Sequence, residues 1–146
     1  MIHDLHSLFT KVGIRFSSSL ENVPIENISA DSRRISKGDL FIGLPGGTVD
    51  GGCYWREAIS SGAVAALVSV NAAKIVPPAN DDMVIVVSDS IAYLLGELSS
   101  TFWGQPSSKM NLIGVTGTNG KTTTSHLIEH LSKASGKPTG LFGTLV

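Results

Sequence analysis

A glycine-rich stretch followed by lysine and threonine has the residue types of a phosphate-binding loop. Residues 116–124 read Thr-Gly-Thr-Asn-Gly-Lys-Thr-Thr-Thr. Gly117 and Gly120 can adopt backbone angles that are closed to other residues, which lets consecutive N–H groups converge on one anion. Lys121 would then reach the β- and γ-phosphates of ATP, and the Thr122 hydroxyl would bind Mg²⁺. The stretch therefore predicts a Mg-ATP site.

Such a loop needs a strand before it and a helix after it, and its flanks have the sequence patterns of both. The apolar run over residues 111–116 predicts a buried strand. Residues 121–135 predict a helix, whose unpaired N–H groups and positive dipole end would favour phosphate. A second strand is expected from Thr139. Val115 stands where the general motif has a glycine, but this context makes the match much stronger than Gly-Lys-Thr alone.

The chain before this motif alternates helical and extended patterns over about a hundred residues, an ordinary size for a domain. Strands that alternate with helices are typical of a parallel sheet covered by helices. The fold class is therefore predicted as α/β. Helices are expected over residues 5–12 and 54–61 and from Ser90 onward, buried strands over 40–44, 63–70 and 83–87, and a short extended segment over 23–28.

Two polar segments are candidates for a ligand contact and for a domain boundary. Residues 45–52 contain four glycines, so their backbone can approach a ligand closely, although a flexible surface turn fits the same composition. Residues 105–109 are polar and contain a proline, which is typical of a linker. We therefore predict a first domain over residues 1–104, a linker over 105–110, and the beginning of a phosphate-loop domain over 111–146.

The second domain is expected to continue beyond Val146. The strands of a phosphate-loop domain are covered on both faces and need parallel neighbours. Two strands and one helix would leave most of their apolar surface in water, and the apolar run of residues 141–146 has no closing element after it. These residues alone are therefore not expected to catalyse, and the loop within them is expected to bind ATP poorly.

Composition and charge exclude several classes of protein. The 146 residues are 42% hydrophobic with a mean hydropathy of +0.21, as in a packed globular chain. A net charge of −1 leaves no electrostatic footprint for nucleic acid or an anionic membrane. The longest apolar run, about eight residues around 63–70, is too short to span a membrane. The lone Cys53 cannot form an internal disulfide, and a cytoplasmic monomer is expected.

Two other groups of residues suggest chemistry but have simpler explanations. His126, Glu129 and His130 fit the spacing of a zinc-protease motif. The segment is the helix after the phosphate loop and a third ligand is hard to find, so an exposed pair of histidines is favoured. Asp31 and Ser32 could belong to a nucleophile group, but no base is spaced to activate the serine, and a turn or helix cap fits both residues.

Several short motifs occur in order along the chain: Asp-Ser-Arg at 31–33, Gly-Asp-Leu-Phe at 38–41, Leu-Pro-Gly at 44–46, Asp-Gly at 50–51, and Ala58 with Gly-Ala at 62–63. Together they resemble the N-terminal domain of Mur ligases of the MurE type, the UDP-N-acetylmuramoyl-tripeptide synthetases. Phe-Trp-Gly-Gln-Pro-Ser at 102–107, leading into the phosphate loop, looks like that family's entry into its ATP domain. The resemblance covers residues 28–146.

The resemblance implies an activity and a set of contacts. An N-terminal domain would hold the UDP end of UDP-MurNAc-L-Ala-D-Glu, and a central domain would bind ATP and Mg²⁺. The γ-phosphoryl group would move to the D-Glu carboxylate, and the amine of meso-diaminopimelate or L-Lys would displace phosphate from this acyl-phosphate to form an amide of a peptidoglycan precursor. The residues implied to contact the nucleotide sugar are Ala30, Ser32, Gly47, Thr48 and Val49. Those implied to bind ATP are Gly117, Thr118, Asn119, Gly120, Lys121, Thr122 and Thr123, with Lys121 catalytic and Thr122 on Mg²⁺.

Three other functions stay open. A MurF-type ligase, which adds D-Ala-D-Ala, shares the Asp-Ser-Arg and Gly-Asp-Leu-Phe motifs, although the phosphate loop with its Gly-Gln-Pro lead-in favours the MurE type. A ligase similar to folylpolyglutamate synthetase shares the loop but would not carry the N-terminal motifs. The chain could also be a non-catalytic module that binds a nucleotide sugar. Relatives often have a bulkier residue such as His where this chain has Gly52, so no role is implied at that position.

Overall fold

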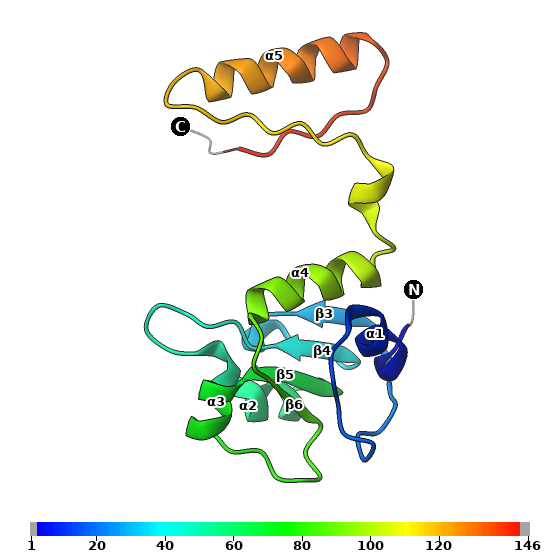
Figure 1. Cartoon of the computed structure of the whole chain (residues 1–146), viewed down its shortest axis with the longest axis vertical. Helices are drawn as coiled ribbons and strands as arrows, with labels where there is room; N and C mark the ends of the chain where they lie inside the picture. The colour runs from blue at the N-terminus through cyan, green and yellow to red at the C-terminus, as the bar shows by residue number, and fades with distance from the viewer. Residues whose placement is uncertain (1–2, 144–146) are drawn as a thin grey trace. The chain divides into compact units, whose positions relative to one another are not determined.

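A computed structural model describes residues 3–143, and the chain divides into two compact units, Met1–Lys109 and Met110–Val146 (Figure 1). The first unit contains a four-stranded parallel sheet in the order β3-β4-β5-β6. Because the strands are parallel, their carboxyl ends meet at one edge of the sheet. The strands are β3 (Asn27–Ser29), β4 (Asp39–Ile42), β5 (Ala65–Ser69) and β6 (Val84–Val87); a separate antiparallel pair joins β1 (His3–Asp4) to β2 (Pro24–Ile25).

Helices cover both faces of the parallel sheet (Figure 1). Leu40 and Leu67 lie in a buried cluster with side chains of the first and fourth helices, whereas Phe41 and Val68 lie in a second cluster with the other two helices. Successive strand residues point to opposite faces, so both faces of the sheet are apolar. The predicted α/β fold is confirmed. The helices are α1 (Leu5–Val12), α2 (Trp55–Ser60), α3 (Val70–Ile75) and α4 (Ile91–Phe102).

Capping residues explain where the helices α1 and α4 begin. At the start of α1, the Asp4 carboxylate accepts a hydrogen bond from the Ser7 N–H at 2.8 Å, and Gly13 ends this helix with a φ of 79°. At the start of α4, the Ser90 hydroxyl accepts one from the Tyr93 N–H at 3.4 Å. Both helices were predicted from sequence and are confirmed. The helices of residues 3–143 are too short or too polar to span a membrane.

The three strands predicted over 40–44, 63–70 and 83–87 are confirmed but shorter than predicted, and one of them gives way to a helix. The strand predicted over residues 63–70 ends at Ser69, whose hydroxyl accepts a hydrogen bond from the Ala72 N–H at 3.0 Å and so caps α3. The sequence prediction missed this helix, because Val70 continues an apolar run that is typical of a strand.

Short 3-10 turns lie at η1 (Ser32–Arg34), η2 (Gly51–Tyr54) and η3 (Pro106–Lys109). The first residue of the helix predicted over 54–61 therefore belongs to η2.

The second unit contains one regular element, α5 (Lys121–Ala134), among the residues described. The helix prediction is confirmed, but the strand predictions are wrong here: residues 111–116 and 139–143 form no strand. A strand needs a neighbour with which to exchange hydrogen bonds, and the described part of this unit contains none. Leu112 and Ile113 are accordingly 73% and 66% exposed. The remainder of the second predicted strand, residues 144–146, lies outside the described residues.

Gly96→Ala should stabilise the first unit. Gly96 is an exposed residue within α4, and nothing lies within 4 Å of the position that a Cβ atom would take. Alanine favours a helix over glycine, so the free energy of unfolding should rise by about 1 kcal/mol in urea denaturation followed by circular dichroism. Gly62→Ala is the matched comparison and should lower it, because Gly62 has a φ of +117°. A Gly96→Ala variant no more stable than the unchanged chain would contradict this account of α4.

Candidate functional site

The predicted phosphate loop, residues 117–120, is exposed and lies directly before α5. Gly117 and Gly120 have φ angles of 149° and 75°, which glycine adopts without strain. Gly120 is the N-cap of α5, and no side chain caps this helix end. Within the described residues, the backbone N–H groups of residues 117–123 take part in no hydrogen bond. They are therefore free to bind an anion, and the helix dipole favours one there.

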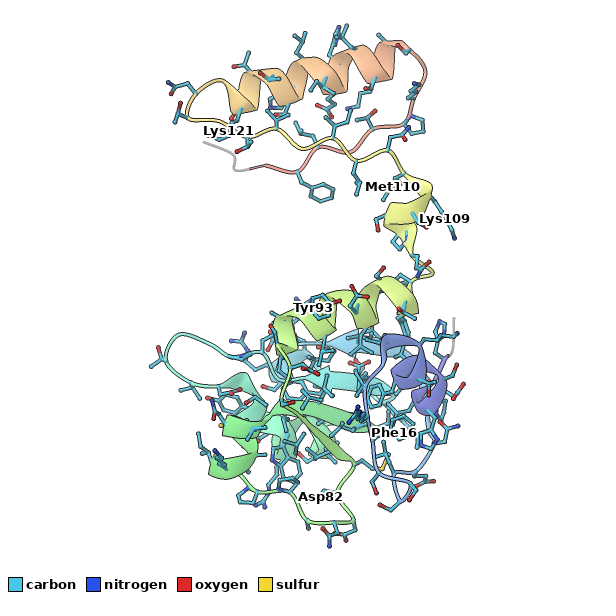
Figure 2. The ribbon with its side chains drawn as sticks, in the orientation of Figure 1. Phe16, Asp82, Tyr93, Lys109, Met110 and Lys121 are labelled. Atoms are coloured by element: carbon cyan, nitrogen blue, oxygen red, sulfur yellow. The ribbon has the colours of Figure 1, made fainter. Side chains whose placement is uncertain are left out.

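The Lys121 side chain folds back over this loop. Its Nζ donates a hydrogen bond to the Gly117 carbonyl oxygen at 2.6 Å, and the contact is exposed. Figure 2 shows Lys121 where the loop meets the first turn of α5. A phosphate oxygen could replace this carbonyl as the acceptor, in a stronger charge-assisted hydrogen bond. The free amides, the ammonium group and the Thr122 hydroxyl, an oxygen ligand of the kind that Mg²⁺ prefers, together fit Mg-ATP.

The residues implied to contact a nucleotide sugar follow two neighbouring strands of the first unit. Ala30 and Ser32 come after β3, and residues 47–49 lie in the loop after β4. Because these strands are parallel, with Ser29 opposite Phe41, both groups leave the sheet at the same edge. Ligands of open α/β sheets bind outside this carboxyl edge. The fold thus places both groups at the edge where a ligand is expected.

Two surface hollows include residues at this edge. The first includes Ala30 but not Ser32, which is half-buried at the start of η1. Arg34 is the positively charged residue that lines this first hollow. The second lies at the ends of β4, β5 and β6, and of its residues only Pro45 belongs to a segment, residues 45–52, that the sequence analysis considered for a ligand contact. The first hollow is lined by Asn27, Ile28, Ser29, Ala30, Asp31 and Arg34; the second is lined by Leu44, Pro45, Ser69, Val70, Asn71 and residues 87–92.

Asp31 caps the turn that contains Ser32 and is not placed to activate it. The Asp31 carboxylate accepts hydrogen bonds from the Arg33 N–H at 3.1 Å and from its Nε and Nη2 at 2.9 and 3.0 Å. These bonds hold the pKa of the Asp31 carboxyl below its ordinary value and raise the pKa of Arg33. The carboxylate is therefore ionised and occupied at neutral pH. The interpretation of Asp31 as a turn or cap residue is confirmed.

The loop after β4 is closed at its base and open at its tip. The Gly51 N–H donates to the Leu44 carbonyl oxygen at 2.9 Å, and the Gly46 N–H donates to the Val49 carbonyl oxygen at 3.1 Å. Within the described residues, no hydrogen bond engages the N–H groups of residues 47–49, all of which are exposed. The tip therefore presents free backbone donors on an ordered base, which suits an anionic ligand.

Sequence reasoning missed two residues that hold this loop. The Asp50 carboxylate accepts a hydrogen bond from the Ser69 hydroxyl at 2.6 Å through Oδ2, and one from the Gly52 N–H at 2.9 Å through Oδ1. Asp50 and Ser69 are 19 positions apart, and only the fold brings them together. The sequence signal for this contact was the Asp-Gly dipeptide at 50–51. It predicts a turn, but it does not predict that the Asp50 carboxylate bonds Ser69.

Packing explains the glycine at position 52. Gly52 is buried, and a Cβ atom there would lie 2.7 Å from the Ala72 Cβ. Real Cβ atoms essentially never approach so closely, so a larger residue does not fit at this position with α3 where it lies.

The zinc motif of α5 has a different role in the structure. Glu129 accepts a hydrogen bond from the Lys133 ammonium at 2.7 Å, and the His126 Nδ1 lies 3.5 Å from its other oxygen. The Lys133 hydrogen bond lowers the pKa of the Glu129 carboxyl.

Burial raises the pKa of the Cys53 thiol in the first unit. Over residues 3–143, no three His, Cys, Asp or Glu side chains are grouped to hold a metal ion.

The fold and these two groups of residues define an α/β protein with a phosphate loop and a second candidate ligand site at the edge of a parallel sheet. Residues 24–103 match the Mur ligase family, catalytic domain, and residues 115–146 match the Mur ligase middle domain. The first match alone covers more than half of the chain. The chain belongs to the Mur ligase family.

Curated relatives agree with this assignment. A UDP-N-acetylmuramoyl-L-alanyl-D-glutamate–2,6-diaminopimelate ligase of Prochlorococcus marinus is 58% identical over 145 residues, which cover 99% of this chain and 29% of that protein. Proteins of the same name from Synechococcus sp. and Synechococcus elongatus are 53% and 46% identical, over 100% and 85% of this chain and 29% and 25% of their own lengths. This chain thus spans less than a third of the curated relatives that it matches.

Solved structures share the fold. MurF of Acinetobacter baumannii superposes with a TM-score of 0.63 at 20% identity, covering 92% of this chain and 28% of that chain. MurF of Thermotoga maritima, solved in complex with ADP, has a TM-score of 0.53 at 27% identity and covers 74% of this chain and 23% of its own. The first likeness supports the fold alone.

Proposed function

We propose that this chain is part of an ATP-dependent ligase that adds meso-diaminopimelate to UDP-MurNAc-L-Ala-D-Glu in peptidoglycan precursor synthesis. The observation that carries the proposal is the loop before α5, with its free amides and Lys121. The 58% identical relative named for this reaction favours diaminopimelate over L-Lys. A MurF-type reaction has weaker support, since the MurF structures share 20–27% identity with this chain.

Each domain predicted from the sequence has its own part in this proposal. Residues 1–104 would bind the UDP end of the substrate through the groups at the carboxyl edge of the sheet: Ala30, Ser32, Gly47, Thr48 and Val49. Residues 105–110 would be the linker, and residues 111–146 would begin the domain that binds ATP. ATP and UDP-linked sugars are cytoplasmic metabolites, so a cytoplasmic enzyme is expected, acting as a monomer.

The proposed reaction requires that the reacting groups be positioned and that the negative charge of the phosphates be neutralised. A carboxylate oxygen of D-Glu attacks the γ-phosphorus, and the bond from that phosphorus to ADP breaks. The amine of diaminopimelate then attacks the acyl carbon, loses a proton and displaces inorganic phosphate. Lys121 and the amides of residues 117–123 would hold the phosphate oxygens, which is the main requirement of phosphoryl transfer. A Mg²⁺ ion held by Thr122 would neutralise phosphate charge when bound.

Calorimetric titration of the chain with UDP-MurNAc-L-Ala-D-Glu tests the first unit's part. Saturable binding at one site per chain is expected. Ser32→Ala should weaken it about tenfold, the effect of losing one hydrogen bond to a charged group. Ser60→Ala is the control, because the Ser60 hydroxyl bonds only the Glu57 carbonyl within α2, at 2.9 Å, among the contacts described. A chain that does not bind this nucleotide sugar would refute the assignment.

A further inference from the structure

Both carboxylate oxygens of Asp50 are used inside the protein. Oδ1 accepts a hydrogen bond from the Gly52 N–H at 2.9 Å, and Oδ2 accepts one from the Ser69 hydroxyl at 2.6 Å. Asp50 is half-buried, and it ends the loop whose tip, residues 47–49, is exposed. A carboxylate engaged on both oxygens is suited to holding a loop rather than to binding a cation or accepting a proton from substrate.

Ser69 connects this carboxylate to the sheet. Its Oγ also accepts a hydrogen bond from the Ala72 N–H at 3.0 Å, as the cap of α3. A backbone N–H can only donate, so the single hydroxyl proton of Ser69 remains for Asp50. One chain of hydrogen bonds therefore runs from α3 through the last residue of β5 to the end of the loop.

This link differs in kind from the other hydrogen bonds of the loop. The bonds from Gly51 to Leu44 and from Gly46 to Val49 join the two arms of the loop to each other. The bond between Asp50 and Ser69 joins the loop to a neighbouring strand, and it is charge-assisted and short. It therefore fixes where the tip stands relative to the carboxyl edge of the sheet.

We propose that Asp50, acting through Ser69, is a positioning residue that holds residues 47–49 in the shape that binds the nucleotide sugar. The inference rests on the proposed function of this loop. It assigns Asp50 no contact with the substrate. Breaking the link should leave the sheet intact and free the tip to move, so the cost should appear in affinity for the nucleotide sugar.

A double-mutant cycle on the chain tests this, with UDP-MurNAc-L-Ala-D-Glu as the titrant. Asp50→Asn and Ser69→Ala should each raise the dissociation constant about tenfold. The double variant should match either single variant, because the first change removes the charge and the second the hydroxyl of the same charge-assisted hydrogen bond. Ser69→Thr keeps the hydroxyl and should bind within about twofold of the unchanged chain. Hydrogen exchange in Ser69→Ala should speed up at the hydrogen-bonded amides of Gly46, Gly51 and Gly52 and stay unchanged in α4.

Asp82→Asn provides the matched control. The Asp82 carboxylate accepts a hydrogen bond from the Ala79 N–H at 2.7 Å, in a turn before β6 (Figure 2). That turn lies at the amino edge of the parallel sheet, opposite the proposed site. The variant should therefore weaken a turn contact by the same loss of charge without any change in affinity, which separates positioning from general stability.

The outcomes distinguish the inference from the function on which it rests. If the unchanged chain does not bind the nucleotide sugar, the proposed function fails and the inference fails with it. If the unchanged chain binds but Asp50→Asn or Ser69→Ala binds equally well, the inference alone is overturned. Additive losses in the double variant, or an equal loss in Asp82→Asn, would also overturn it.

Discussion

Lys121→Ala should lower the turnover of the complete ligase at least about a hundredfold, the scale of one lost charge contact in a transition state. Lys121 already reaches across the phosphate loop to the Gly117 carbonyl, at 2.6 Å. The negative charge on the transferred phosphoryl group is what this ammonium would stabilise, and the loop amides cannot replace a full positive charge. Steady-state release of inorganic phosphate, measured at saturating substrates, gives the turnover.

Lys133→Ala on the same helix is the matched control. Lys133 is exposed and pairs with Glu129 in the last turns of α5, away from the loop. Exposed pairs of this kind contribute little to stability, so turnover should stay within about twofold. A near-normal rate in Lys121→Ala would rule out its assignment, and an equal fall in Lys133→Ala would point to disruption of α5 instead.

Gly43→Ala should destabilise the first unit by about 3 kcal/mol or prevent it from folding. A Cβ atom on Gly43 would lie 2.2 Å from the Gly52 Cα, which is backbone and cannot swing aside as a side chain could. These two glycines stand on either side of the loop over residues 45–50. The clash would therefore also force apart the base of the proposed substrate loop. Urea denaturation followed by tryptophan fluorescence measures the loss.

Gly47→Ala is the comparison for that experiment. Nothing lies within 4 Å of a Cβ atom at Gly47, in the tip of the same loop. Its free energy of unfolding should stay within about 0.5 kcal/mol of the unchanged chain. If Gly43→Ala and Gly47→Ala were equally stable, the close approach of the two backbone segments would not exist in solution.

The helices whose start and end signals lie in the local sequence could be predicted. The spacing of Leu5, Leu8 and Phe9 predicts α1, and the Ser90 hydroxyl predicts the start of α4, because both signals lie within a few residues of the element itself. The strands predicted over residues 111–116 and, among the residues described, over 139–143 were wrong for the opposite reason. Strands depend on neighbours elsewhere in the fold, and an apolar run alone does not supply them.

The two candidate sites differ in the same respect: the first could be predicted from local sequence, whereas the contacts that hold the second could not. The loop before α5 is contiguous in sequence, so its glycines and Lys121 could be recognised without any structure. The contact between Asp50 and Ser69 joins residues from different strand ends, and no spacing rule predicts it. The tight packing of Gly52 against α3 was equally hidden, because that helix itself was missed.

The product that the complete ligase makes from UDP-MurNAc-L-Ala-D-Glu tests the central claim most directly. The enzyme that contains this chain is given ATP, Mg²⁺ and an equimolar mixture of meso-diaminopimelate, L-Lys and D-Ala-D-Ala, and the products are identified by mass spectrometry. We expect the diaminopimelate adduct, with one ADP and one phosphate released for each amide formed. An adduct with L-Lys or D-Ala-D-Ala, or an adduct formed without ADP, would contradict the proposed function.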